Sequence, residues 1–167
     1  MREIGISHPR LPLPAPGRED NPALFLEWLG EAIPLVEHLG IREMRRDEEK
    51  LIWELDLAPS LNDKGTGFGG ALAAQATLLG WCWTTLWLRR HSMARDVVVA
   101  EASQRFLAPV TGDYRMVCMP EREDGSVKLA EGLTGRGKGR ITLLQQLWCD
   151  DTLCLEASGD YAVLPGA

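Results

Sequence analysis

The chain has 167 residues, of which 45% are hydrophobic and 25% are charged, and its formal net charge is −6. These values are typical of one globular domain and exclude a disordered chain, while the acidic balance excludes a nucleic-acid partner, which would need a basic face. The three histidines and four cysteines lack metal-ligand spacing and the N-terminus lacks a secretion signal. We therefore expect a cytoplasmic protein with reduced thiols and no metal.

The chain opens with a proline-rich arm at residues 1–20, and residues 21–167 are expected to form a single domain. Proline favours extended backbone at its own position and at the residue before it, so the arm is either wrapped on the domain or loose. Asn21 followed by Pro22 is a typical helix start. The apolar spacing that follows predicts a helix that reaches Leu39 through a kink at a proline.

Two strands, predicted at 41–45 and 51–57, lead to a segment without any charged residue, from Gly65 to Leu88. Its apolar residues cover every face of a helix that ends near Arg90, so the helix lies either in a protein core or in a bilayer. Four glycines at its start and Gln75 within it favour the core. A buried helix without any site is the plain alternative.

Alternating patterns predict four further strands, at 96–107, 113–119, 140–148 and 152–164. A helical turn or two is expected between them, at 126–133. A sheet that curls around one apolar helix satisfies all of these segments at once, because the helix is then buried and each strand has one face towards it. The sequence therefore predicts an α+β fold, with an antiparallel sheet of about six strands wrapped round one long central helix.

Four runs of residues carry a family resemblance: IPLVEHLGI at 33–41, APSLNDKGTGFGGALAA at 58–74, LGW at 79–81 and FLAPVTGD at 106–113. In this order they resemble the hotdog-fold thioesterases related to the C-terminal domain of YiiD. The resemblance implies a hydrolase acting on acyl thioesters of coenzyme A or carrier protein. It also implies a homodimer or tetramer with the site between subunits. The lack of ligand clusters predicts a reaction with no cofactor beyond the coenzyme A of the substrate, and the composition of an ordinary soluble protein predicts no membrane partner.

The sequence departs from the commoner hotdog signature at two positions. That signature places an Asn six residues before His-Gly-Gly and a carboxylate further along the helix. Here Asn62 and the pair Gly69-Gly70 keep the spacing, but Phe68 replaces the histidine and Thr77 replaces the carboxylate. The base or nucleophile of the usual reaction is therefore in doubt, whereas the fold is not.

The glycine-rich start of the central helix is the main candidate for chemistry. Backbone amides at Gly69 and Gly70 are positioned to hold the oxyanion of a reacting thioester, because the first amides of a helix lack internal partners. Gly65 and Thr66 are expected to let the substrate approach the backbone closely, and Phe68 to wall the acyl channel. Alternatively, the glycines only shape a turn.

Five polar residues are weighed as catalytic, each against a plainer role. Asn62 either orients water or the carbonyl, or closes an Asx-turn or caps the helix. Asp63 is either the general base or a solvated loop charge. Thr77 either holds a water or bonds back to its own helix. Ser103 and Glu101 share a strand face. If this face lines the cleft, Ser103 positions water and Glu101 supplies the missing carboxylate; otherwise both side chains are solvated.

Three cations alternate with glycines late in the chain, at Arg136, Lys138 and Arg140. They either bind the phosphates of coenzyme A or form a solvated loop. The hypothesis is thus a metal-free acyl-thioester hydrolase whose base is unassigned. The alternatives are a non-catalytic acyl-CoA-binding hotdog protein, a hotdog dehydratase or hydratase (disfavoured by Phe68) and a membrane protein.

Overall fold

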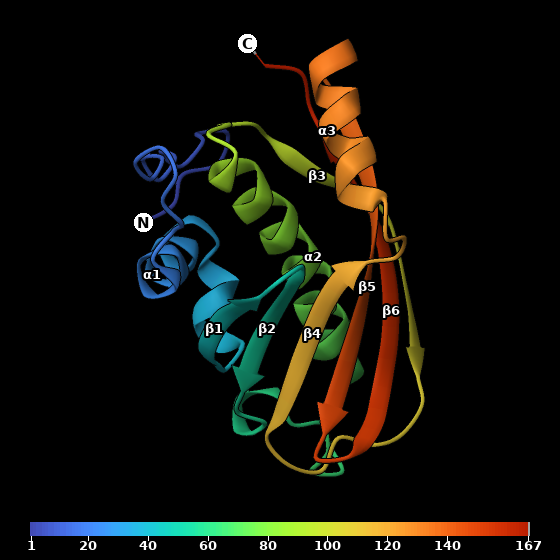
Figure 1. Cartoon of the computed structure of the whole chain (residues 1–167). Helices are drawn as coiled ribbons and strands as arrows, with labels where there is room; N and C mark the ends of the chain where they lie inside the picture. The colour runs from blue at the N-terminus through green and yellow to red at the C-terminus, as the bar shows by residue number, and fades with distance from the viewer. Residues whose placement is uncertain (167) are drawn as a thin grey trace.

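In the computed structural model, which describes residues 1–166, one long helix lies in the curve of a six-stranded antiparallel sheet (Figure 1). The helix, α2, spans Gly69–Arg90. The strand order is β1-β2-β4-β5-β6-β3. In chain order the strands are β1 (Ile41–Asp47), β2 (Lys50–Leu55), β3 (Val97–Phe106), β4 (Tyr114–Pro120), β5 (Gly139–Cys149) and β6 (Thr152–Val163). The predicted α+β architecture is confirmed.

The charge-free segment is buried because its helix packs closely on the sheet. Gly80 makes this approach possible, since a Cβ atom there would lie 2.2 Å from the phenol of Tyr161 on β6. The hydroxyl of Tyr161 donates a hydrogen bond of 2.7 Å to the carbonyl oxygen of Thr77 in α2. None of the helices in residues 1–166 combines the length and the apolarity that crossing a membrane requires.

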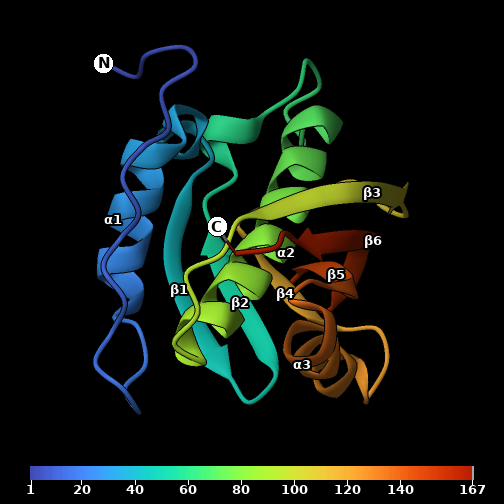
Figure 2. The same cartoon turned by 90° about the horizontal axis from the view of Figure 1, so that it is seen from above.

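The first predicted helix is present in two parts. Asn21 caps α1, which spans Pro22–Ala32, and its Oδ1 accepts hydrogen bonds from the amides of Ala23 and Leu24. A 3-10 turn, η1, follows at Pro34–His38, because the proline interrupts the helical hydrogen bonds. Figure 2 shows α1 and the N-terminal arm beside β1, on the side of the molecule opposite to α3 (Gly125–Arg136).

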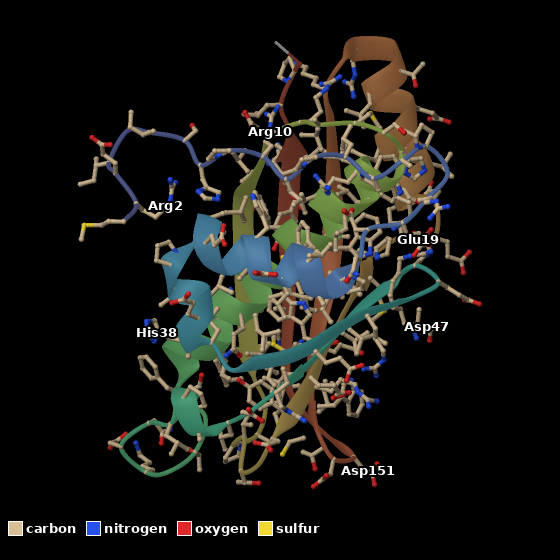
Figure 3. The ribbon with its side chains drawn as sticks, turned by 90° about the vertical axis from the view of Figure 1, so that its left-hand side faces the viewer. Arg2, Arg10, Glu19, His38, Asp47 and Asp151 are labelled. Carbon is tan, nitrogen blue, oxygen red and sulfur yellow. The ribbon has the colours of Figure 1, made fainter. Side chains whose placement is uncertain are left out.

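The proline-rich arm is wrapped on the domain (Figure 3). Arg89 at the end of α2 binds Asp20 through both carboxylate oxygens and donates to the carbonyl oxygen of Leu11. The indole of Trp28 on α1 donates to the carbonyl oxygen of Pro9 at 2.9 Å. These long-range contacts hold the arm in place and leave the loose alternative unsupported.

Two details differ from the sequence prediction. The expected turn or two at 126–133 is a longer helix, α3, which ends where Gly137 adopts a positive φ of 71°. Strand β3 contains a register shift between Val99 and Glu101, which moves one residue out of the alternating pattern. This shift decides which β3 side chains face α2.

Candidate active site

The loop that enters α2 is organised by the side chain of Asn62. Its Oδ1 accepts from the amides of Lys64 (2.9 Å) and Thr66 (3.0 Å). Its Nδ2 donates to the Thr66 hydroxyl (2.9 Å) and to the Gly67 carbonyl (3.3 Å). Gly65 sits in the turn with φ 75°, where a residue with a Cβ would be strained. The Asx-turn alternative is therefore present, and all polar atoms of the Asn62 side chain are used within the loop.

The first turn of α2 has unused hydrogen-bond donors. Phe68 is the N-cap, with φ −74° and ψ 119°, and provides no side-chain acceptor. Its own amide donates to the carbonyl oxygen of Ser60 at 2.7 Å. The next three amides, of Gly69, Gly70 and Ala71, donate to no acceptor among residues 1–166. Such donors lie at the positive end of the helix dipole and suit a developing negative charge on oxygen.

Two aromatic rings flank these amides. The side chain of Phe68 is 53% exposed and that of Phe106, at the end of β3, is 55% exposed. A Cβ atom on Gly69 would lie 3.4 Å from the Phe106 ring, and one on Gly70 would lie 2.7 Å from the Phe68 ring. The tip of α2 is thus a polar point surrounded by exposed apolar surface, as an acyl thioester would require.

A buried polar network behind the tip was missed by the sequence analysis. Gln75 is fully buried, and its Nε2 donates to the carbonyl oxygen of Leu39 (3.0 Å) and to the Ser60 hydroxyl (3.3 Å). Its Oε1 accepts from the Tyr114 hydroxyl at 2.7 Å. Burial raises the pKa of Tyr114, and the hydrogen bond to Gln75 opposes the rise. Because Ser60 also binds the Phe68 amide, this network fixes the loop at the tip. The only sequence signal of the network was a single amide side chain, Gln75, in a mostly apolar helix.

An apolar groove of about 460 Å³ runs along α2 away from the tip. It lies between α2, η1 and β3, and is lined by Ile33, Leu35, Val36, Leu39, Ala73, Ala74, Thr77, Leu78, Trp81 and Val99. Thr77 contributes the only hydroxyl of this lining. Its side chain makes no hydrogen bond to residues 1–166, whereas the hydroxyl of Thr84 bonds back to the Gly80 carbonyl at 3.0 Å. The expected back-bonding alternative for Thr77 is therefore wrong.

Two of the remaining catalytic candidates lie away from the tip within one chain. Glu101 and Ser103 pair with Asp160 and Ser158 on the outer face of the sheet, because directly paired residues point to the same side and the inner side is taken by alternating buried residues of β6. The hypothesis that Glu101 and Ser103 line the cleft of their own chain is wrong. Asp63 is exposed and pairs with Lys64 at 3.0 Å.

The basic cluster lies far from the tip. Arg136, Lys138 and Arg140 stand where β5 begins, level with the start of β3, while Phe106 at the other end of β3 contacts the tip. The length of β3 separates the two places by roughly 30 Å. Figure 1 shows α3, which ends at Arg136, at the end of the sheet away from the start of α2. The cluster of one chain therefore does not lie beside the tip of the same chain, and its binding to the phosphates of coenzyme A stays a prediction.

Comparison with known proteins decides the family. Residues 24–165 match the family described as "Putative thioesterase (yiiD_Cterm)". The chain belongs to this thioesterase family. Family membership places the protein among hydrolases of thioester bonds, and the predicted resemblance is confirmed.

Solved structures agree with this assignment. A "putative thioesterase" from Shewanella oneidensis is 29% identical, with a TM-score of 0.75, and the match covers 86% of this chain and 96% of that one. A protein of unknown function from Chlorobaculum tepidum is 26% identical, with a TM-score of 0.78 over 86% and 94% of the two chains. A thioesterase from Haemophilus influenzae shares the fold at 16% identity, with a TM-score of 0.71 over 89% and 94%.

Proposed function

We propose that this protein hydrolyses acyl thioesters, carried by coenzyme A or a carrier protein, at the N-terminal tip of α2. The observation that carries the proposal is the uncapped first turn of α2, whose three unpaired amides lie one helical turn from an apolar groove of about 460 Å³. The amides bind the carbonyl oxygen and the groove holds the acyl chain. The reaction uses no metal or other cofactor.

Hydrolysis at this tip proceeds by attack of water on the thioester carbonyl carbon. The negative charge that develops on the carbonyl oxygen is stabilised by the amides of Gly69 and Gly70. The carbon–sulfur bond then breaks, the thiolate leaves and takes up a proton, and a carboxylic acid remains. Asn62 acts here as a positioning residue that holds the loop, because its own side-chain amide is fully occupied.

The attacking water is assigned to Thr77, and this assignment requires a second copy of the chain. Thr77 lies seven residues after Gly70, so their backbones are about 10 Å apart along the helix, whereas reacting atoms must approach to roughly 3 Å. A two-fold axis beside Ala73 and Ala74 would place Gly70 of one copy opposite the partner's Thr77. The small side chains of Ala73 and Ala74, which line the groove, leave room for the acyl chain between the two helices.

The exposed edge strand β3 supports the same homodimer. β3 ends the sheet, and its Val98, Val99 and Phe106 are exposed, which is unusual for an edge that stays uncovered. With α2 antiparallel to its copy, the partner's basic cluster (Arg136, Lys138 and Arg140) is carried towards this chain's tip. In that arrangement these cations meet the phosphates of coenzyme A.

Asp63 is the proposed general base. It is the carboxylate nearest to the tip in sequence, and its exposed side chain has only Lys64 as a partner among residues 1–166, so it is free to turn towards bound substrate. Asp63→Asn should lower kcat about 10²-fold while leaving KM unchanged. Equal kcat values for the two proteins would remove Asp63 from this role.

The experiment that tests the function is a thiol-release assay over a series of acyl-CoAs, from acetyl to palmitoyl, on the wild-type protein. A matched pair of variants links turnover to the groove. Leu78→Trp fills the groove, whereas Leu24→Trp makes the same substitution at an exposed position of α1 outside it. We expect Leu78→Trp to lose kcat/KM most for long chains and Leu24→Trp to match the wild type.

Absence of thiol release over the whole series would contradict hydrolysis. Saturable acyl-CoA binding without turnover would favour the non-catalytic binder, for which the lack of a carboxylate in the groove lining is the supporting observation. Release that is lowered equally by both tryptophan variants would contradict the placement of the acyl chain.

A further inference from the structure

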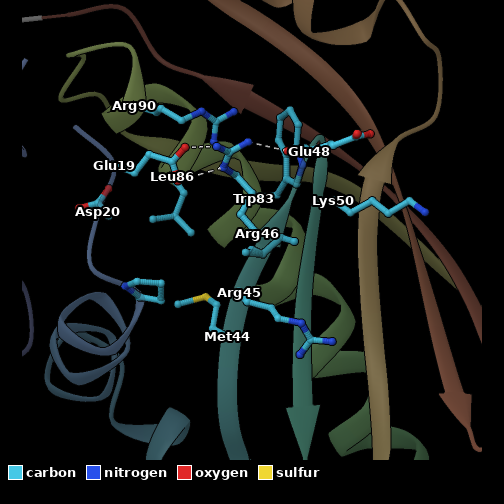
Figure 4. Close-up of a pocket in the computed structure, with 12 residues that line it drawn as sticks. Glu19, Asp20, Met44, Arg45, Arg46, Glu48, Lys50, Trp83, Leu86 and Arg90 are labelled. Carbon is cyan, nitrogen blue, oxygen red and sulfur yellow. Dashed lines mark hydrogen bonds and ion pairs between the residues drawn. The ribbon is translucent and has the colours of Figure 1, made fainter. Parts of the chain in front are cut away.

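A second cavity, of about 270 Å³, lies near the other end of α2 (Figure 4). It is enclosed by the end of the N-terminal arm, the hairpin of β1 and β2, and the last turns of α2. The residues that matter for its chemistry are Glu19, Met44, Arg46, Trp83, Leu86 and Arg90. None of them lines the acyl groove.

The inner wall of this cavity is apolar and fixed. Met44 and Trp83 are about 5% exposed, and Leu86 lies one turn beyond Trp83 on α2. The indole Nε1 of Trp83 donates to the carbonyl oxygen of Glu49 at 2.7 Å, which ties the β1–β2 turn to the helix. The cavity therefore has a preformed apolar surface rather than a mobile one.

The rim carries two neighbouring guanidinium groups with unequal partners. Arg46 pairs with Glu19 of the arm and donates to the carbonyl oxygen of Glu48 at 2.7 Å. Arg90 is partly buried and makes no hydrogen bond or ion pair within residues 1–166. Burial lowers the pKa of Arg90, the charge of Arg46 lowers it further, and Glu49 opposes this. The rim thus has one cation whose charge lacks a direct counterion.

The adjacent residue, Arg89, has hydrogen-bond partners for its guanidinium group among residues 1–166, in contrast to Arg90. Arg89 donates to both oxygens of Asp20 and to the carbonyl oxygens of Leu11 and Pro12. Structural pairing of the helix end with the arm is therefore complete without Arg90. A half-buried guanidinium that makes no hydrogen bond or ion pair within residues 1–166 is suited to bind a carboxylate or phosphate of a ligand.

We propose that this cavity binds a small organic anion, with a carboxylate or phosphate head on Arg90 and Arg46 and an apolar body against Trp83, Leu86 and Met44. At about 30 Å³ per water-sized group, the cavity has room for about nine non-hydrogen atoms, which is enough for the apolar body of the ligand while its charged head lies at the rim. Glu19 of the arm competes with the ligand for Arg46 and therefore lowers the affinity of the cavity for an anion. This site is separate from the proposed hydrolysis and does not depend on it.

The test follows the Trp83 indole N–H by NMR while sodium octanoate or phenyl phosphate is added to the full-length protein. Octanamide, which has the same body without the charge, is the neutral control. We expect saturable shifts of the Trp83 signal with an anion and none with octanamide. Saturation by octanoate alone or by phenyl phosphate alone identifies the head group. The Trp81 signal reports separately on any ligand in the acyl groove.

Two substitutions with opposite signs make the test specific. Arg90→Gln should weaken binding about tenfold or more, because it removes the unpaired cation. Glu19→Gln should tighten binding several-fold, because it frees Arg46. Arg122→Gln, at an exposed cation outside the cavity, should bind as the wild type does.

No saturable Trp83 shift in the wild type would overturn the proposal, as would equal affinities of the wild type and Arg90→Gln. If Arg90→Gln does not fold, Glu19→Gln decides alone: unchanged or weaker binding overturns the proposal. Because no arm of this test measures turnover, its failure is distinguishable from failure of the proposed hydrolysis.

Discussion

The two ends of α2 differ in how many of their polar groups have partners. At the arginine end, His91 donates its amide to the carbonyl oxygens of Trp87 and Leu88, and Arg89 is fully bound by the arm. At the glycine end the N-cap is Phe68, which caps nothing. The backbone and Arg89 are thus paired at the arginine end, whereas the first backbone amides at the glycine end are left open by residues 1–166, and an acyl oxygen can bind there.

The first prediction concerns the closed end and has the largest expected effect. Arg89→Ala leaves Asp20 buried without a cation, since the two side chains are only 8% and 10% exposed. We expect a loss of about 3–5 kcal/mol in the free energy of unfolding, measured by urea denaturation. Arg90→Gln, one residue on, should lose less than about 1 kcal/mol. Equal losses would mean that the arm does not fasten this end.

The second prediction concerns the loop at the open end. Asn62→Ala removes four hydrogen bonds inside the loop and should lower the free energy of unfolding by about 2 kcal/mol. Thiol release should fall with it, because the tip amides lose their fixed position. Asn62→Asp keeps both acceptor bonds and should be intermediate. Full activity in Asn62→Ala would remove this residue from the mechanism.

The third prediction separates the groove hydroxyl from others on the same helix. Thr77→Val keeps the shape of the side chain but cannot hold a water, so kcat should fall about tenfold, which corresponds to about 1.4 kcal/mol, at unchanged stability. Thr85→Val removes a buried hydroxyl without a partner among residues 1–166 and should leave kcat unchanged. If both variants behave alike, Thr77 has no special role.

The fourth prediction closes the open end artificially and has the smallest expected free-energy change of the four. Phe68 already has the extended backbone of an N-cap, so a serine there can accept from the amide of Gly70 or Ala71. Phe68→Ser should gain about 1 kcal/mol of stability and lose activity, because that amide becomes occupied. Phe68→Ala, which removes the ring without adding a cap, should show no gain. A more stable and fully active Phe68→Ser would contradict the proposed use of these amides.

The sequence predicted the fold well because the signals were local. A charge-free helix and strands of period two leave only one arrangement that buries both, and the helix start at Asn21 was identified from its own residues. The glycine tip was likewise visible in the sequence. That its amides lack partners followed only from the structure, which shows Phe68 without a capping acceptor.

The misplaced site residues all depended on distant pairing. The face of Glu101 and Ser103 was set by a register shift at Val99, which alternation within one strand cannot predict. The Gln75 network joins residues up to 39 positions apart. Asn62 was ambiguous for a different reason, since closing a turn and orienting a water use the same side-chain amide.

The most direct measurement compares kcat for thiol release between Gly69→Pro and Gly69→Ala. Proline is tolerated at the first helical position, and the extended Phe68 has the conformation preferred before proline. The two variants therefore differ chiefly in one backbone N–H. We expect both to fold, and Gly69→Pro to lose about 10²-fold in kcat relative to Gly69→Ala. Equal kcat values in two folded variants would contradict catalysis by the amides at the tip of α2.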